Sequence, residues 1–257
     1  MGYLIDTHAH LDMYEDWQEV IDDALKNGVE RIIIPSVELQ YFEKVKDIAH
    51  SAENVYYMLG IFPSEAQKWS DDIISDIKKY SGDDKLVGIG EIGLDYYWDK
   101  SFVDEQKEVF KKQILLANEL KLPIAVHDRD AHKDCFDLLK EYNNGSDVIF
   151  HCFSGSVEFA NEVIKEGWYI ALGGVVTFKN AVKAKEVAKN IPLERLMLET
   201  DSPYLTPVPY RGKENRPSYV RFVADEIANL RGIEVDELKN ITSQNAEKVF
   251  RLKAVRY

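Results

Sequence analysis

The chain has 257 residues, of which 45% are hydrophobic and 30% are charged, and its formal net charge is −13. This composition predicts a globular protein with a sizeable core, and no apolar run approaches the roughly 18 residues that a membrane span requires. The acidic balance argues against a protein that coats nucleic acid over a broad face, although a single phosphodiester can still be bound in a pocket where cations supply positive charge.

Short apolar runs rich in β-branched residues alternate with longer amphipathic stretches. In chain order, the expected strands are residues 3–5, 31–34, 56–60, 85–90, 123–126, 148–150, 168–172 and 195–198. Intervening segments such as residues 17–27, 102–120 and 181–189 carry apolar residues at helical spacing. The alternation predicts parallel strands joined by crossover helices. Eight repeats in about 250 residues favour an α/β fold with a single (β/α)8 TIM barrel, one domain over residues 1–257, above an open doubly wound sheet.

Two segments follow the last expected strand. Residues 202–217 contain four prolines and are longer than a usual strand-to-helix connection, and such loops are often functional. Residues 235–251 predict one or two closing helices, with a helix cap expected within residues 242–245.

Side chains that can bind metals stand where the expected strands end. They are His8, His10, Glu91, His127, His151 and Asp201. His8 and His10 alternate on an extended chain, so both imidazoles can point to one side. Glu91 directly follows an apolar, glycine-flanked strand, where an unpaired charge would be costly. In a barrel the carboxyl ends of the strands meet at one face, so these side chains are expected to form one metal site.

The composition of this set indicates which metals it suits. Four imidazoles and two carboxylates without a thiolate suit Zn, Mn or Fe, with Mg possible if water completes the coordination shell. Six ligands exceed what one tetrahedral ion uses, which favours two divalent ions, with Mg, Mn and Zn as the candidates. A two-ion site can bind the attacking water, lower its pKa and clamp a phosphoryl oxygen.

The same residues, together with the sequence motifs in which they stand, resemble those of the TatD-type metal-dependent deoxyribonucleases of the amidohydrolase superfamily. The matching motifs are residues 6–11, 90–95, 127–131, 151–155, 173–180 and 199–205, so the resemblance spans nearly the whole chain. It implies that one ion is surrounded by His8, His10, Glu91 and Asp201. It also implies that the other is held by Glu91, His127 and His151, with Glu91 bridging. Glu91 and Asp201 are then the catalytic residues, and Asp201 takes the proton of the attacking water.

The activity implied by the resemblance is hydrolysis of phosphodiester bonds in DNA, with RNA as a second possible substrate. The acidic balance favours a pocket that admits a single-stranded terminus over a groove that grips long duplex. Arg129, Lys179 and Arg211 stand in loops from which they can contact substrate phosphates, although each can equally be an ordinary surface cation.

Two positions depart from the family pattern. Relatives usually carry a His in a Gly-x-His-Pro motif after the third strand, and this chain has Phe62 at the position of that His. Phe62 can neither bind a metal nor protonate a leaving group; core packing is the favoured interpretation, with stacking on a nucleobase as the alternative. In the long loop, Glu214 and Arg216 have exchanged places relative to the Arg-Gly-Lys-Arg-Asn-Glu-Pro motif that is usual in relatives. An ion pair between the two side chains could compensate for the exchange.

Two other functions remain open at this stage. Carbonyl and phosphoryl attack use the same activated water, so the chain can also be an ester or amide hydrolase, such as a deacylase that removes D-amino acids from tRNA. A non-catalytic binding protein is the third possibility, and retention of all six ligand-type residues argues against it.

The remaining features suit a cytoplasmic enzyme. Cys135 and Cys152 are too few for a disulfide framework and fit a reducing compartment, and Cys152 is interpreted as a packing residue and not a nucleophile. The first residues lack a basic segment followed by an apolar stretch, so no signal peptide is expected. His50 and His132 are expected at the surface or at a helix cap. We expect neither membrane association nor an obligate protein partner.

Overall fold

The computed structural model describes residues 2–252, in which all eight expected strands form. They are β1 (Leu4–Asp6), β2 (Val29–Pro35), β3 (Val55–Leu59), β4 (Leu86–Asp95), β5 (Ile124–Arg129), β6 (Val148–Phe150), β7 (Tyr169–Leu172) and β8 (Leu196–Leu198). Each strand pairs in parallel with the next along the chain, in the order β1 to β8.

The two outer strands of this order meet and nearly close the sheet. The backbone N–H of Thr7, just after β1, donates to the carbonyl of Leu198 at the end of β8, at 3.1 Å. Ala9 and Ser202 form an isolated parallel bridge beyond it. The fold is therefore the expected (β/α)8 barrel, and the open doubly wound sheet is excluded.

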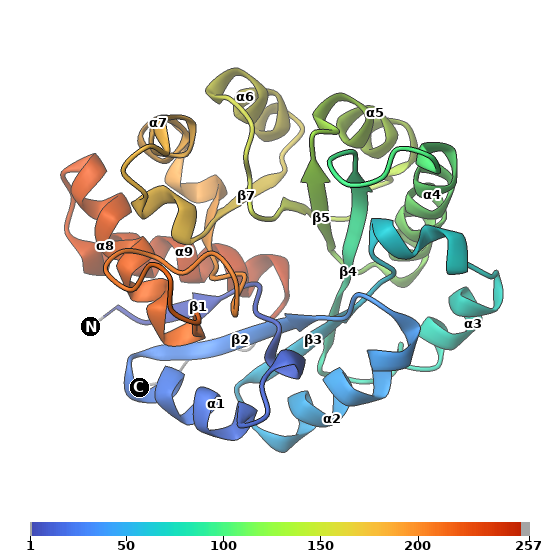
Figure 1. Ribbon diagram of the computed structural model, residues 1–257, viewed down its shortest axis with the longest axis horizontal. Coiled ribbons are helices and arrows are strands. Elements are labelled where there is room, and N and C mark those ends of the chain that lie inside the picture. The colour runs from blue at the N-terminus through green and yellow to red at the C-terminus, as the bar shows by residue number, and fades with distance from the viewer. Residues whose placement is uncertain (1, 253–257) are drawn as a thin grey trace.

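Helices surround the barrel in chain order, as the colour sequence around the ring shows (Figure 1). They are α1 (Trp17–Lys26), α2 (Phe42–Ser51), α3 (Asp72–Lys78), α4 (Val103–Leu120), α5 (His132–Tyr142), α6 (Val157–Lys165), α7 (Val182–Asn190) and α8 (Val220–Arg231). The last helix, α9 (Val235–Val249), packs against one end of the barrel instead. The helices expected at residues 17–27, 102–120 and 181–189 correspond to α1, α4 and α7 within one residue at each end. Within residues 2–252, none of these helices combines the length and apolar character needed to cross a membrane.

The core has two layers, which the alternation of side chains along each strand creates. One layer packs between the strands and the surrounding helices. The other fills the barrel interior with side chains such as Ile33, Met58 and Tyr169, and Val249 and Phe250 at the end of α9 join it. Because α9 and the interior layer fill one end of the barrel, the site can open only at the other.

Two local expectations were wrong. Strand β4 does not stop at residue 90 but continues to Asp95, because residues 86–95 are all buried and its last three residues pair with β5. Residues 242–245 do not cap a helix but lie inside the single helix α9. Their side chains fasten α9 to the barrel instead: Ser243 donates to the carbonyl of Tyr3, and Asn245 donates to the carbonyls of Leu193 and Leu196.

Candidate metal centre

The six expected ligands converge at the carboxyl ends of the strands. His8 and His10 follow β1, Glu91 lies in β4, His127 in β5, His151 directly after β6, and Asp201 three residues after β8. Five of them line a cavity of about 1200 Å³, and the sixth, His8, is fully buried behind it. Glu91 lies within its strand and not at the end of it, at an irregularity in the β4–β5 register between Ile89 and Ile92.

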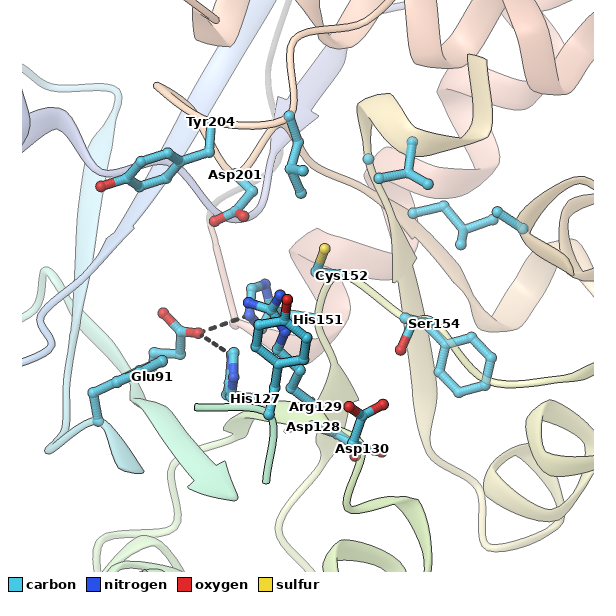
Figure 2. Close-up of a pocket in the computed structure, with 18 of the residues that line it drawn as sticks. Glu91, His127, Asp128, Arg129, Asp130, His151, Cys152, Ser154, Asp201 and Tyr204 are labelled. Atoms are coloured by element: carbon cyan, nitrogen blue, oxygen red, sulfur yellow. Dashed lines mark hydrogen bonds and ion pairs between the residues drawn. The ribbon is translucent and has the colours of Figure 1, made fainter. Parts of the chain in front are cut away.

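The Glu91 carboxylate is the centre of the cluster. Its Oε1 lies 2.8 Å from Nδ1 of His127 and 2.8 Å from Nε2 of His151. Its Oε2 lies 3.3 Å from Nε2 of His8 and 3.8 Å from Nε2 of His10. Figure 2 shows this carboxylate directed toward His127 and His151, with Asp201 on another wall of the same cavity. One carboxylate therefore lies between two pairs of imidazoles.

Ligand-type atoms fall into three compact groups within the described residues. One contains His8, His10 and Asp201, and another contains Glu91, His127 and His151. These two groups have the members that the family resemblance implies for two ions, except that Glu91 belongs to the second group only. The third group contains His8, His151 and Glu199.

The donor chemistry of the cluster fits divalent cations. His127 lies between two carboxylates, with its Nε2 3.0 Å from Oδ2 of Asp95 and its Nδ1 2.8 Å from Oε1 of Glu91, so the ring donates to both when it is protonated. When the ring is neutral, Asp95 holds the proton on Nε2, and the Nδ1 lone pair is free to bind a cation beside Glu91. Nδ1 of His8, His10 and His151 is also buried without a hydrogen-bond partner among residues 2–252. In these three rings Nε2 is the nitrogen that faces Glu91, and a neutral ring with its proton on Nδ1 offers the Nε2 lone pair to a cation there.

The electrostatic environment keeps both ligand carboxylates ionised. Burial acts to raise the pKa of Glu91, but the charge on His151 and the hydrogen bonds from His127 and His151 outweigh it, and the pKa lies well below its usual range. Burial likewise acts to raise the pKa of Asp201, and the hydrogen bond from His10 with the charge on His151 brings it below its ordinary value. Both groups are therefore available as ligands or as proton acceptors.

Asp95 is a functional candidate that the sequence reasoning missed. Its Oδ2 accepts from Nε2 of His127, while its Oδ1 accepts the backbone N–H groups of Tyr97 at 2.9 Å and Trp98 at 3.4 Å. Gln106 of α4 in turn donates to the backbone carbonyl of Asp95 and accepts from its N–H. Asp95 thus holds the orientation of a candidate ligand histidine and, when that ring is neutral, keeps its proton on Nε2. Asp95 is the last residue of the motif at residues 90–95, which matches the family pattern, and this match could have identified it from the sequence.

Glu199 and Asp6 are two further buried carboxylates behind the cluster. Oε1 of Glu199 lies 3.7 Å from Nδ1 of His151 and accepts the N–H of Cys152 at 2.5 Å. Asp6 accepts both the backbone N–H and the hydroxyl of Thr200, and burial raises the pKa of Asp6 well above its ordinary value. Asp6 therefore joins β1 to the segment after β8 and holds His8 and His10 in register with Asp201.

Phe62 lies on the cavity wall, so the core-packing interpretation was wrong. It is partly exposed, it lines the cavity, and its ring meets that of His127 edge to face at 4.5 Å between centroids. Cys152 also lines the cavity; burial raises the pKa of its thiol well above the ordinary value, which favours the unreactive thiol form. His50 is exposed, and His132 begins α5, where its ring lies 2.7 Å from the Asp128 carboxylate.

The three expected phosphate contacts differ in position. Arg129 lines the cavity, whereas Lys179 and Arg211 are not among the described residues that do so. Lys179 is exposed on the loop before α7, and the guanidinium of Arg211 stacks on the Phe178 ring at 3.9 Å. A role for any of them in binding phosphate stays a prediction.

The exchanged residues of the long loop do not form an ion pair. Among the described residues, no salt bridge includes Glu214 or Arg216. The loop is held instead by Asn215, which is fully buried and donates to the carbonyls of Thr200 and Tyr204.

Comparison with known proteins gives consistent matches over almost the full length. A family model described as TatD related DNase matches residues 5–251. The uncharacterized metal-dependent hydrolase YabD of Bacillus subtilis is 46% identical, over 97% of this chain and 99% of the relative. The uncharacterized metal-dependent hydrolase YcfH of Escherichia coli is 36% identical, over 99% of this chain and 98% of the relative. The crystal structure of YjjV, a TatD homolog from Escherichia coli, superposes with a TM-score of 0.90 at 29% identity and covers 97% of this chain and 98% of its own.

Proposed function

The chain belongs to the family of TatD-related DNases and is a metal-dependent hydrolase, and from this premise we propose that it cleaves phosphodiester bonds at the ends of single-stranded DNA. The observation that carries the proposal is the position of Glu91 between four imidazoles, with Asp201 facing the same cavity. The arrangement suits hydrolysis of one bond held at the end of a barrel.

Two divalent ions fit the side chains present. His8, His10 and Asp201 would hold one, and His127 with His151 the other, with Glu91 available to both. When bound, such ions supply positive charge that polarises a phosphoryl oxygen and makes water more acidic. Asp95 keeps the His127 ring in the tautomer that has its lone pair on Nδ1, facing this site.

Asp201 is the group placed to take up the proton of the attacking water. It remains ionised, its side chain is 16% exposed at the cavity surface, and its Oδ1 lies 3.4 Å from Nε2 of His10. Phe62 occupies the cavity wall without a titratable group, so the wall at that point cannot supply a proton to the leaving oxygen. Asp201 can return to the leaving oxygen the proton it has accepted, which balances the reaction without a second acid.

The surroundings of the cavity favour a chain terminus as substrate. Acidic side chains such as Glu38, Glu65 and Asp130 line it, and the chain as a whole carries a net charge of −13. Long duplex bound across such a surface would meet repulsion along its phosphates, whereas an end that enters the cavity meets the bound ions first.

The decisive experiment combines metal analysis with cleavage of end-labelled oligonucleotides. We expect the purified protein loaded with Mn or Mg to release nucleotides from single-stranded DNA faster than from duplex. The same preparation is assayed on single-stranded RNA and on a D-aminoacyl-tRNA ester. Hydrolysis of the ester with no cleavage of DNA would replace the proposal with a deacylase, and absence of both turnover and bound metal would indicate a binding protein.

Asp201→Asn tests the role of Asp201 as the proton acceptor. The amide is isosteric with the carboxylate but cannot accept the proton, so we expect kcat to fall by about 10²–10⁴-fold with the melting temperature nearly unchanged. Single-turnover cleavage and thermal unfolding measured on the same samples check this. A variant that keeps more than about a tenth of the wild-type rate would contradict the assignment of Asp201 as the proton acceptor.

A further inference from the structure

Exposed apolar side chains gather at the mouth of the cavity. Of the nine large hydrophobic side chains that are exposed among residues 2–252, five line the cavity. They are Met13, Tyr97, Trp98, Val182 and Tyr204. Tyr97 is 53% exposed and Trp98 is 74% exposed. Large apolar side chains concentrated around one opening mark a binding surface, because scattered exposure would place them evenly over the molecule.

The loop that carries Tyr97 and Trp98 is held in place by its backbone. The carboxylate of Asp95 accepts the N–H groups of both residues, and the N–H of Tyr96 donates to the carbonyl of Arg129 at 2.9 Å. The hydroxyl of Tyr96 also donates to Asp134 of α5 at 2.8 Å. The two exposed rings therefore stand on an anchored loop, and a ligand that binds them does not have to order it.

Arg129 adds a cation beside the rings. Its guanidinium lies 3.9 Å from the centroid of the Tyr97 ring and 5.4 Å from that of Trp98. No carboxylate of residues 2–252 forms an ion pair with it, so the N–H groups at its edge remain available. A guanidinium held by its face on an aromatic ring can still bind a phosphate with its edge.

The position of these three residues relates them to the metal centre. Arg129 follows His127 by two residues in β5, so the two side chains leave the same face of the strand about 7 Å apart at the backbone. Asp95 joins the aromatic loop to His127 directly by its hydrogen bonds. A ligand on the rings would therefore lie beside the metal centre, where a nucleotide next to the scissile bond would be expected.

We propose that Tyr97, Trp98 and Arg129 form a subsite that stacks one unpaired nucleobase on Trp98 and binds an adjacent phosphate through Arg129. The subsite rests on the proposed function, since it names how that cavity recognises its substrate. Trp98 meets Tyr97 edge to face at 4.8 Å between centroids and is still 74% exposed, so part of its ring surface is available to a base. A base in a duplex is already stacked and paired, so this subsite selects a single-stranded end.

Equilibrium binding tests the subsite independently of cleavage. The probe is a fluorescently labelled single-stranded phosphorothioate octamer, which resists hydrolysis, titrated with the metal-loaded protein. Loss of one base–aromatic stack predicts that Trp98→Ala weakens binding about 5- to 150-fold, while Trp98→Phe retains most of the affinity. Leu115→Ala, an exposed residue of α4 away from the cavity, is the control and leaves affinity unchanged.

A second arm asks whether the contact is to a base. The octamer is remade with an abasic residue at each position in turn, and Trp98→Ala is compared with the wild type on every probe. At one position near the bound end, removal of the base should abolish the difference between the two proteins. Equal affinity of Trp98→Ala and wild type for the intact octamer overturns the subsite, as does a Trp98→Ala defect that persists on every abasic probe.

These outcomes separate the subsite from the activity. If the wild type cleaves DNA but Trp98→Ala binds it equally well, the subsite is wrong and the nuclease function stands. If binding depends on Trp98 and on one base but no oligonucleotide is cleaved, the subsite stands and the reaction has been assigned wrongly. If the wild type does not bind the octamer, both proposals fail.

Discussion

At the scale of single residues, the site consists of side chains that bind and others that orient them. His127 faces Glu91 through one ring nitrogen and Asp95 through the other, at 2.8 Å and 3.0 Å. Burial acts to raise the pKa of Asp95, but the hydrogen bond from His127 outweighs it, so the pKa is below its ordinary value and the group stays a charged acceptor. An ionised partner raises the basicity of the imidazole and holds the tautomer that binds a cation.

Removal of the Asp95 carboxylate should therefore weaken metal binding. We expect Asp95→Ala to lower the affinity for Mn²⁺ by about 10- to 100-fold, because the His127 ring loses its fixed tautomer and orientation. Calorimetric titration of metal-free protein measures this without any assay of activity. Asp99→Ala is the matched control, since Asp99 is exposed on the same loop and its carboxylate bonds to Ser101 and to neither His127 nor Glu91. Equal affinities of the two variants for Mn²⁺ would show that Asp95 stabilises only the loop at Tyr97 and Trp98 and does not contribute to metal binding.

The sequence identified the binding side chains better than the orienting ones. His8, Glu91 and Asp201 interrupt or follow apolar runs, where a charged or imidazole group has no other obvious partner. Asp95 lies beyond the apolar run at residues 85–90, and Glu199 is followed by the polar residues Thr200 and Asp201. A carboxylate in such a position is more often a cap or a loop contact. Which nitrogen of His127 faces Asp95, and which nitrogen of His151 faces Glu199, depends on ring orientation, which no pattern in one dimension encodes. Phe62 was misassigned for a similar reason, because the local sequence around an aromatic residue does not distinguish a cavity wall from a hydrophobic core.

At the scale of elements, the pairing of β4 with β5 determines where Glu91 and His127 meet. Gly93 pairs with His127, and its backbone has φ +146°, a conformation open to glycine and costly for other residues. A Cβ at this position would lie 2.0 Å from the carbonyl oxygen of His127. The two strands can approach this closely only because residue 93 has no side chain.

A methyl group at position 93 should therefore destabilise the fold. We expect Gly93→Ala to reduce the free energy of unfolding by at least about 2 kcal/mol, from backbone strain and from the clash with β5 together. Gly145→Ala is the control, because Gly145 has φ +94° but nothing within 4 Å of the added Cβ, and it isolates the backbone cost of about 1 kcal/mol. Urea unfolding of both variants provides the comparison. If the two lose the same stability, the close approach of β4 and β5 is not constrained by residue 93.

Strand order was predictable from the sequence, but strand ends were less so. The eight apolar runs gave the right number of strands because each must bury a β-branched segment inside the barrel. Strand β4 is longer than its apolar run because the glycines and Glu91 within it are buried by the neighbouring strands and by the metal centre. The polar segment at residues 242–245 resembles a helix start in sequence, yet Ser243 and Asn245 bond to carbonyls at the base of the barrel. Those tertiary partners outweigh the local preference of the residues.

At the scale of the whole molecule, a strongly acidic protein is proposed to bind a polyanion. The cations that line the cavity among the described residues are Arg129 and Lys183, against several carboxylates. Most of the attraction must then come from the bound ions and from stacking, not from a basic surface. This differs from proteins that grip DNA through many phosphate contacts, whose affinity collapses as salt increases.

The salt dependence of binding follows from this distribution of charge. With two side chains and the ion-bound phosphate as the main contacts, the slope of log affinity against log salt should be no steeper than about −2, since each neutralised phosphate of a single strand contributes about −0.7. Affinity for the phosphorothioate octamer should accordingly fall less than about 20-fold between 50 and 200 mM KCl. Lys183→Gln should flatten the slope by about 0.7, whereas Lys179→Gln, whose side chain is exposed outside the cavity lining, should leave it unchanged. A slope steeper than about −4 would mean that a broad basic surface binds the strand, and a flattening by Lys179→Gln would assign Lys179 to the phosphate path.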